Sequence, residues 1–251
     1  FLDQEEYYIG LDQLDPVTRE QLKAGDWGIS QDSRFRKSWA QYYSVRGLHY
    51  CLGKGGKGAT HQKDELQRIF CTVDPAASAR EGPGDKDIWR KQPSYTVIST
   101  WGLTQDYNLL WLDMRRFRKE IPDILQEVRN VYKIWQPQYF IVEATGLGKG
   151  AYQMLAKCGL PVKAVHPHYD KLVRATDAMN RMEQGRIWLP ETAGWLHDCE
   201  KELFTWTAHP HQSDDIIDTL SYAALDISWE ASHDERSFAE MYTDDLPGII
   251  M

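Results

Sequence analysis

Several features that usually classify a protein are missing from this sequence. No run approaches the roughly 18–20 apolar residues that a membrane span needs, and the N-terminus lacks a signal-peptide pattern. The cysteines are few and scattered, and no C-x-x-C pair occurs among them: they are Cys51, Cys71, Cys158 and Cys199. This spacing argues against a zinc site or a disulfide framework and favours reduced cysteines in a cytoplasmic protein.

The sequence also lacks the excess of positive charge that is typical of nucleic-acid-binding proteins. Its 29 Lys and Arg stand against 37 Asp and Glu, which gives a net charge of −8. Six acids and one arginine follow residue 229, so an acidic tail holds −5 of this charge. Lysines and arginines form three groups elsewhere in the sequence. These groups could contact phosphates, or they could be ordinary solvated surface. They are Lys54, Lys57 and Lys63; Arg80, Lys86, Arg90 and Lys91; and Arg115, Arg116, Arg118 and Lys119.

From residue 66 onward, short apolar runs alternate with amphipathic stretches. The strand-like runs cover 66–73, 95–101, 108–114, 139–143, 162–166 and 187–189, and the helix-like stretches cover 121–135, 146–155, 170–184, 195–204 and 214–229. This order predicts a mixed α/β sheet with helices on both faces. Residues 1–50 show no clear core periodicity, and 54–59 has the composition of a flexible loop.

Two acidic residues end strand-like runs. Asp74 follows Ile69-Phe70-Cys71-Thr72-Val73, and Glu143 follows Tyr139-Phe140-Ile141-Val142. Because the carboxyl ends of neighbouring central strands open into one crevice, we expect both side chains in one site. An aspartate before a proline is also a common turn initiator, which is the alternative for Asp74 taken alone.

A third group of acids, Asp214, Asp215 and Asp218, opens the last helix. The helical wheel places the apolar residues of this helix on one stripe and Asp215 and Asp218 on the polar side, so periodicity alone predicts exposure to solvent. Ser213 or Asp214 could simply cap the helix. Capping accounts for one acid, however, and gives no special reason for three within five residues.

Together these carboxylates are the candidate metal ligands of the chain. Like charges buried close together are unfavourable unless a cation neutralises them, and oxygen ligands of this kind suit Mg²⁺ or Mn²⁺. Two such ions can activate a water molecule and stabilise the leaving oxygen of a phosphoryl displacement. His209 and His211 could assist, although histidines in a loop are more often plain polar residues. The ligand candidates are Asp74, Glu143, Asp215, Asp214 and Asp218, and the first four are the candidate catalytic residues.

Five segments, in order, resemble the C-terminal nuclease domain of the large terminase subunit of tailed bacteriophages. They are Phe70–Ala76, Phe140–Gly148, Asp170–Ala175 with the later Gly185-Arg186-Ile187, Glu202-Leu203-Phe204, and Asp214–Leu220. Their order and spacing match over roughly residues 66–228. Upstream, Leu14–Leu22 and Gly25-Asp26-Trp27 resemble the segment that joins the ATPase motor to the nuclease. No G-x-x-x-x-G-K-[ST] loop occurs and the chain begins at Phe1, so we expect a fragment that follows an absent motor.

The resemblance implies a ribonuclease H-like mixed sheet flanked by helices on both faces. It also implies a metal-dependent endonuclease that cuts double-stranded DNA concatemers during viral genome packaging, with two ions of Mg²⁺ or Mn²⁺. It favours Asp215 over Asp214 as the metal ligand. Lys171 and Arg174, on one helical face, would contact DNA phosphates, and a solvated helix start is the alternative.

The same resemblance implies partners and a domain organisation. The expected partners are double-stranded DNA, the ATPase motor of the same full-length chain, the portal and the small terminase subunit, in the host cytoplasm and without a membrane. The expected domains are a linker or helical segment at 1–60, the nuclease at 61–229 and a mobile acidic tail at 230–251. Family members commonly carry another aspartate before the second strand, where this sequence has Ser94-Tyr95-Thr96. Asp85 or Asp87 could replace that aspartate.

Two other functions fit the same residues. One is a junction resolvase or transposase-like nuclease on the same fold, which the closing Asp-Asp helix after Glu202-Leu203-Phe204 disfavours. The other is a non-catalytic docking module for portal or small-terminase proteins. Loss of metal-dependent cleavage on replacing the acids would separate an enzyme from a docking module.

Overall fold

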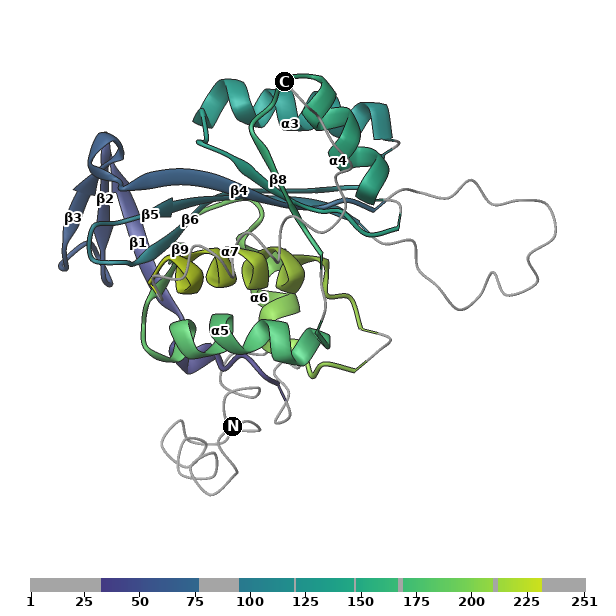
Figure 1. Ribbon diagram of the computed structural model, residues 1–251. Helices are drawn as coiled ribbons and strands as arrows, with labels where there is room; N and C mark the ends of the chain where they lie inside the picture. Colours follow the sequence, from purple (N-terminus) through teal and green to yellow (C-terminus); the bar gives the residue numbers. More distant parts are fainter. Residues whose placement is uncertain are drawn as a thin grey trace, which may run out of the picture.

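A single mixed β-sheet with helices on both faces organises the chain (Figure 1). The computed structural model describes residues 33–76, 95–119, 121–146, 148–166, 169–209 and 212–231. The strands run in the order β3-β2-β1-β9-β6-β5-β4-β7-β8. They are β1 (Gln41–Arg46), β2 (His49–Leu52), β3 (Thr60–Gln62), β4 (Arg68–Asp74), β5 (Thr96–Leu103), β6 (Leu109–Phe117), β7 (Phe140–Glu143), β8 (Val162–Val165) and β9 (Ile187–Pro190).

The helices form a layer on each face of this sheet. Helices α3 (Ile121–Trp135) and α4 (Gly148–Lys157) cover one face, while α5 (Lys171–Glu183), α6 (Leu196–Thr205) and α7 (Asp215–Ala231) cover the other (Figure 1). Two short 3₁₀ helices, η1 (Lys37–Trp39) and η2 (Lys63–Glu65), flank the first strands. The predicted α/β class and the predicted strands and helices from residue 66 onward are therefore confirmed.

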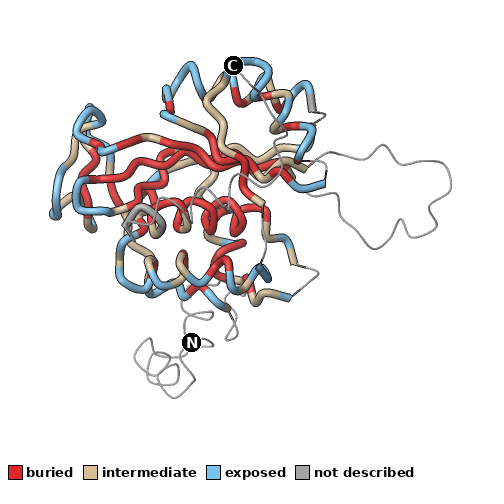
Figure 2. Tube along the Cα trace, viewed as in Figure 1, coloured by how far each residue is buried: buried red, intermediate tan, exposed pale blue. Residues whose placement is uncertain are grey.

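The central strands are buried on both faces, as Figure 2 shows. Every residue of β5 is buried, because α7 covers one of its faces and α3 lies against the other. Side chains alternate between two cores along each strand, as the pleat requires. Phe70, Trp101 and Ile141 pack with α5, α6 and α7, whereas Cys71, Ile98 and Val142 pack with α3 and α4.

Strands β1 to β3 extend the sheet beyond the elements that the sequence indicated. β1 pairs in parallel with β9, nearly 150 residues later, and antiparallel with β2. Tyr43 of β1 is buried, and its hydroxyl donates a hydrogen bond to the Trp111 carbonyl at 2.9 Å. The linker expected up to residue 60 thus contains strands of the main sheet between residues 41 and 62. Part of the core against which they pack, Leu110 and Leu112 of β6, lies far away in the sequence, so residues 41–52 show no clear periodicity of their own.

Some sequence predictions fall on residues outside the described ranges. These are the linker-like segment before residue 33, the acids Asp85 and Asp87, Ser94, His211 and the acidic tail beyond residue 231. Among the helices of the described ranges, none combines the length and the apolar character that crossing a membrane requires.

Candidate active site

The two strand-end acids lie side by side on the same face of the sheet. β4 and β7 are parallel neighbours, with Val73 opposite Val142, and Asp74 and Glu143 are the next residue of each strand. Phe70 and Ile141 point into the core beneath α7, so the period of two directs Asp74 and Glu143 to that same face. Both side chains are half-buried. The strand-end prediction for these two acids is therefore consistent with the observed topology.

A cation completes this cross-strand row. Asp74 is opposite Val97 of β5, and Val97 is opposite Arg116 of β6. The Arg116 guanidinium lies 3.8 Å from a carboxylate oxygen of Asp215, at the start of α7. The backbone N–H of Tyr95, next to β5, donates to the same Asp215 oxygen at 3.2 Å. Asp215 is thus fixed against the sheet at the end of this row.

The acids of α7 are buried, which corrects the prediction that they face solvent. Asp215 is 7% exposed and Asp218 is 5% exposed. The polar stripe of α7 faces α5 and the sheet rather than water, and the Thr219 hydroxyl lies 2.9 Å from that of Ser99 on β5. The helical wheel gave the polar side correctly, but a polar stripe can face a polar crevice as well as solvent.

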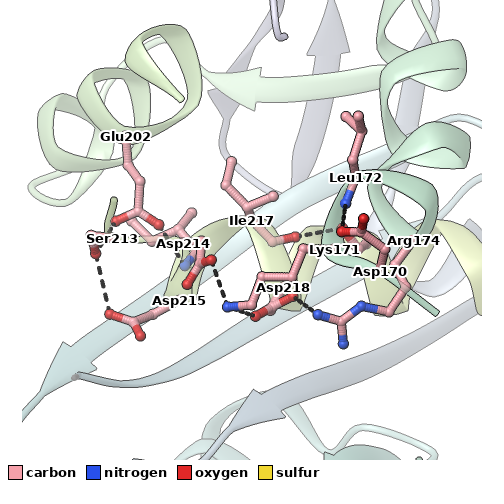
Figure 3. A network of polar contacts seen from close by, with 12 residues as sticks. Asp170, Lys171, Leu172, Arg174, Glu202, Ser213, Asp214, Asp215, Ile217 and Asp218 are labelled. Atoms are coloured by element: carbon pink, nitrogen blue, oxygen red, sulfur yellow. Dashed lines mark hydrogen bonds and ion pairs between the residues drawn. The ribbon is translucent and has the colours of Figure 1, made fainter. Parts of the chain in front are cut away.

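The N-terminus of α7 is capped from α6. A carboxylate oxygen of Glu202 accepts the Ile216 N–H at 2.7 Å, and the other accepts the Ser213 hydroxyl at 3.0 Å. Arg116 forms an ion pair with Glu202 at 3.1 Å. The prediction that Ser213 or Asp214 caps this helix is not what the described contacts show, because Asp214 binds Lys171 and Ser213 donates to Glu202 and Asp215 (Figure 3).

Two cations of α5 contact Asp218 and its neighbour Asp214, the residue before α7 (Figure 3). The Lys171 ammonium contacts Oδ2 of Asp214 and lies 3.2 Å from Oδ2 of Asp218. Arg174 donates to Oδ1 of Asp218 at 2.9 Å. Arg174 is 7% exposed, which leaves little surface for the DNA contact predicted for it, whereas Lys171 is 48% exposed.

A hydrogen-bond chain continues from Arg174 to Glu143. Arg174 donates to the Tyr222 hydroxyl at 3.0 Å, and Tyr222 donates to one carboxylate oxygen of Glu143. The Thr145 hydroxyl donates to the other oxygen of Glu143. Burial, with the charges of Asp218 and Glu143 next in size, raises the pKa of Tyr222, so this phenol stays protonated and remains a donor. Glu143 is therefore held by two neutral donors.

The surroundings of Asp74 disfavour its ionised form. Burial raises its pKa well above the usual range, and the charges of Asp218, Glu143 and Asp215 raise it further. Burial likewise raises the pKa of Asp218 to about 6, although Lys171 and Arg174 act in the opposite direction. Within the described ranges, neither Asp74 nor Glu143 has a Lys or Arg in ion-pair contact. These two carboxylates therefore differ from Asp214, Asp215 and Asp218, each of which contacts a Lys or Arg.

This donor set has the chemistry of a hard-cation site. Four acids offer oxygen ligands, and a divalent cation would relieve the repulsion between their charges. They are Asp74, Glu143, Asp215 and Asp218. In the described part of the chain, no three His, Cys, Asp or Glu side chains already lie close enough to hold a metal ion. Asp218 is engaged by α5, and Glu143 is engaged by Tyr222 and Thr145. The residues therefore fit a divalent cation by type and place, and binding requires their side chains to rearrange.

Several residues of the site escaped the sequence analysis. Four residues orient the predicted acids: Glu202, Arg116, Tyr222 and Thr145. Glu202 and Thr145 lie in segments that resemble the terminase family and Arg116 lies in a group of cations, but the sequence assigned none of these four residues this role. Tyr222 lies one turn after Asp218 on α7, a spacing that could have indicated a shared face. His209 is exposed.

The fold and the acidic row define a ribonuclease H-like domain. The model of the terminase RNaseH-like domain family matches residues 71–226, and the chain belongs to that family. The match covers β4 through most of α7 and includes Asp74, Glu143 and the α7 acids. No curated protein sequence matches the chain.

Solved structures share this fold at low sequence identity. The large terminase nuclease of the thermophilic phage G20c with bound magnesium is 16% identical, with 78% of this chain and 98% of that chain covered and a TM-score of 0.50. Its cobalt-bound form has the same identity and coverage and a TM-score of 0.51. The large terminase of the thermophilic bacteriophage D6E in complex with ADP is 11% identical, with a TM-score of 0.51. That alignment covers 91% of this chain and 53% of the D6E protein.

Proposed function

We propose that this chain is the metal-dependent nuclease domain of a large terminase, which hydrolyses phosphodiester bonds of double-stranded DNA during viral genome packaging. The observation that carries the proposal is the pair Asp74 and Glu143, adjacent on parallel strands, without an ion pair to a Lys or Arg of the described residues, and near enough to Asp215 and Asp218 that their charges raise the pKa of Asp74. Membership of the terminase RNaseH-like family supports the biological role. The G20c terminase nucleases with bound magnesium and cobalt support a divalent cation.

The metal ligands would be Asp74 and Glu143, joined by Asp215 or Asp218 from α7. Asp214 is the weakest candidate, because Asp215 and Asp218 are among the charges that raise the pKa of Asp74 and Asp214 is not. Bound there, two ions of Mg²⁺ or Mn²⁺ would activate a water molecule and stabilise the leaving 3′ oxygen. Tyr222 and Thr145 orient the Glu143 carboxylate, and Arg116 with the Tyr95 amide orients Asp215.

Cations beside the acids would bind the DNA backbone. Arg116 and Arg118 both lie over the Tyr95 ring, at 4.2 and 3.9 Å from its centroid, and Arg118 is exposed. Lys171 is the other exposed cation next to the acids. Contacts of this kind are to phosphates, so binding would be largely independent of sequence and would weaken as salt concentration rises.

The proposal is tested by digesting supercoiled plasmid with the purified chain in Mg²⁺ or Mn²⁺. The wild-type chain should nick and linearise the plasmid, whereas Asp74→Asn and Glu143→Gln should each lower the rate at least about 100-fold, because each removes a negative ligand. The cleavage rates of Asp215→Asn and Asp218→Asn show which of these two α7 acids contributes more to the activity. A branched DNA substrate separates this activity from that of a junction resolvase.

The matched control is Asp106→Asn, an exposed acid in the turn at the opposite end of β5. It should cleave like the wild-type chain. Equal nicking by wild type, Asp74→Asn and Asp106→Asn would point to a contaminating nuclease. A wild-type chain that cuts with no metal, although folded, would refute the proposal.

A further inference from the structure

Lys171 already occupies one half of the acidic site. Its ammonium contacts Oδ2 of Asp218, in the first turn of α7, and Oδ2 of Asp214, the residue before that helix. Arg174 covers the other oxygen of Asp218, Oδ1, at 2.9 Å. An acid whose two oxygens are both in contact with cations cannot coordinate a metal ion without losing one of them.

The two cations differ in how readily they can leave. Arg174 is buried and also donates to Tyr222, so its withdrawal would break a second contact. The Lys171 side chain is 48% exposed. Its ammonium is attached through a flexible four-carbon chain to the first turn of α5. Its departure would expose Oδ2 of Asp218 and Oδ2 of Asp214 together.

The other half of the site has no comparable competitor. Within the described residues, Asp74 and Glu143 form no ion pair with a Lys or Arg, and the donors on Glu143 are neutral hydroxyls. A divalent cation can therefore approach these two acids without displacing a positive charge. The site is thus divided into an open half on β4 and β7 and a half on α7 that a lysine occupies.

We propose that Lys171 is the resident cation of the α7 half, and that a divalent ion binds Asp218 only by displacing its ammonium. This inference rests on the proposed metal-binding function of the site. It implies two unequal binding steps, a tighter one at Asp74 and Glu143 and a weaker one that includes Asp218. Lys171 would thereby set the metal concentration at which the second step occurs.

The experiment is titration of the full chain with Mn²⁺ alone, followed by isothermal calorimetry and by the loss of the free Mn²⁺ signal in electron paramagnetic resonance. Lys171→Met should tighten the weaker step about tenfold, or make it measurable where the wild-type chain shows one step only, because it removes the competing charge. Lys171→Arg keeps the charge and should keep the wild-type profile. Lys133→Met removes an exposed charge near the end of α3 and should change neither step.

The outcomes separate this inference from the proposed function. Unchanged or weaker Mn²⁺ binding in Lys171→Met, with a folded chain by circular dichroism, would overturn the inference. If Asp74→Asn still loses the tighter step in that case, the proposed function stands. No Mn²⁺ binding by the wild-type chain would overturn both. Lys171→Gln is the second variant should the methionine variant fail to fold.

Discussion

Asp74 shows at the scale of one residue how a functional acid costs stability. Its pKa is raised by burial and by the charges of Asp218, Glu143 and Asp215, so its ionised form is unfavourable in the folded chain. The unfolded chain imposes no such penalty. Near neutral pH and without metal, the ionised Asp74 therefore lowers the free energy of unfolding.

Asp74→Asn should accordingly stabilise the metal-free protein while abolishing cleavage. The expected gain is on the order of 1 kcal/mol, or roughly 2–4 °C in Tm for a chain of this size, because the amide keeps the shape and removes the repulsion. Thermal unfolding in EDTA measures it. Added Mn²⁺ should then raise the Tm of the wild-type chain more than that of the variant.

The pH dependence of this gain follows from the direction of the shift. A raised folded-state pKa gives stability that is fully present below the unfolded value, near 3.8, and is lost as pH rises through the folded value. The stability gain of Asp74→Asn should therefore shrink toward acid pH and grow toward neutral pH. A variant that is less stable than wild type in EDTA at neutral pH would contradict this account of the site.

At the scale of elements, the position of α7 depends on Glu202 of α6. Its carboxylate accepts the Ile216 N–H and pairs with Arg116 of β6, so one buried side chain ties two helices to the sheet. Asp215 and Asp218 lie on the first turn of the helix that it caps. A change at Glu202 should consequently affect both folding stability and the placement of Asp215 and Asp218.

Glu202→Ala should lower the free energy of unfolding by about 2–4 kcal/mol, because it leaves a buried N–H and a guanidinium without their acceptor. Glu202→Gln keeps an acceptor for the Ile216 N–H, so its free energy of unfolding should fall by roughly half as much. Urea unfolding gives both values. Glu183→Ala, at an exposed position at the end of α5, is the control and should lose no more than about 0.5 kcal/mol. An equally small loss in Glu202→Ala would mean that this cap does not hold α7.

The elements also show where sequence patterns suffice and where they fail. Central strands such as β4 and β7 are short apolar runs, so their ends, Asp74 and Glu143, could be located from the sequence. Burial of Asp215 and Asp218 could not, because a helical wheel does not say whether a polar stripe faces water or another polar surface. The capping role of Glu202 and the bond from Tyr222 to Glu143 depend on contacts between distant segments.

At the scale of the whole molecule, one sheet joins segments that the sequence keeps far apart. β1 to β3 attach to the rest of the sheet through β9, far away in the sequence, so local periodicity did not indicate them. The site, by contrast, is assembled from β4, β7 and the start of α7, all within the stretch that the terminase RNaseH-like family model matches. The order of strand-like and helix-like stretches along the chain was enough to predict this part of the fold.

The central claim is that Asp74 and Glu143 together bind the divalent cation that the cleavage requires. A crystal structure of the chain soaked in Mn²⁺, with anomalous diffraction at the manganese edge, tests it most directly. The account predicts an anomalous peak within coordination distance of both carboxylates, about 2.0–2.3 Å from their oxygens, with Asp215 or Asp218 as a further ligand. No peak there at saturating Mn²⁺, or a peak coordinated by other residues, would contradict it.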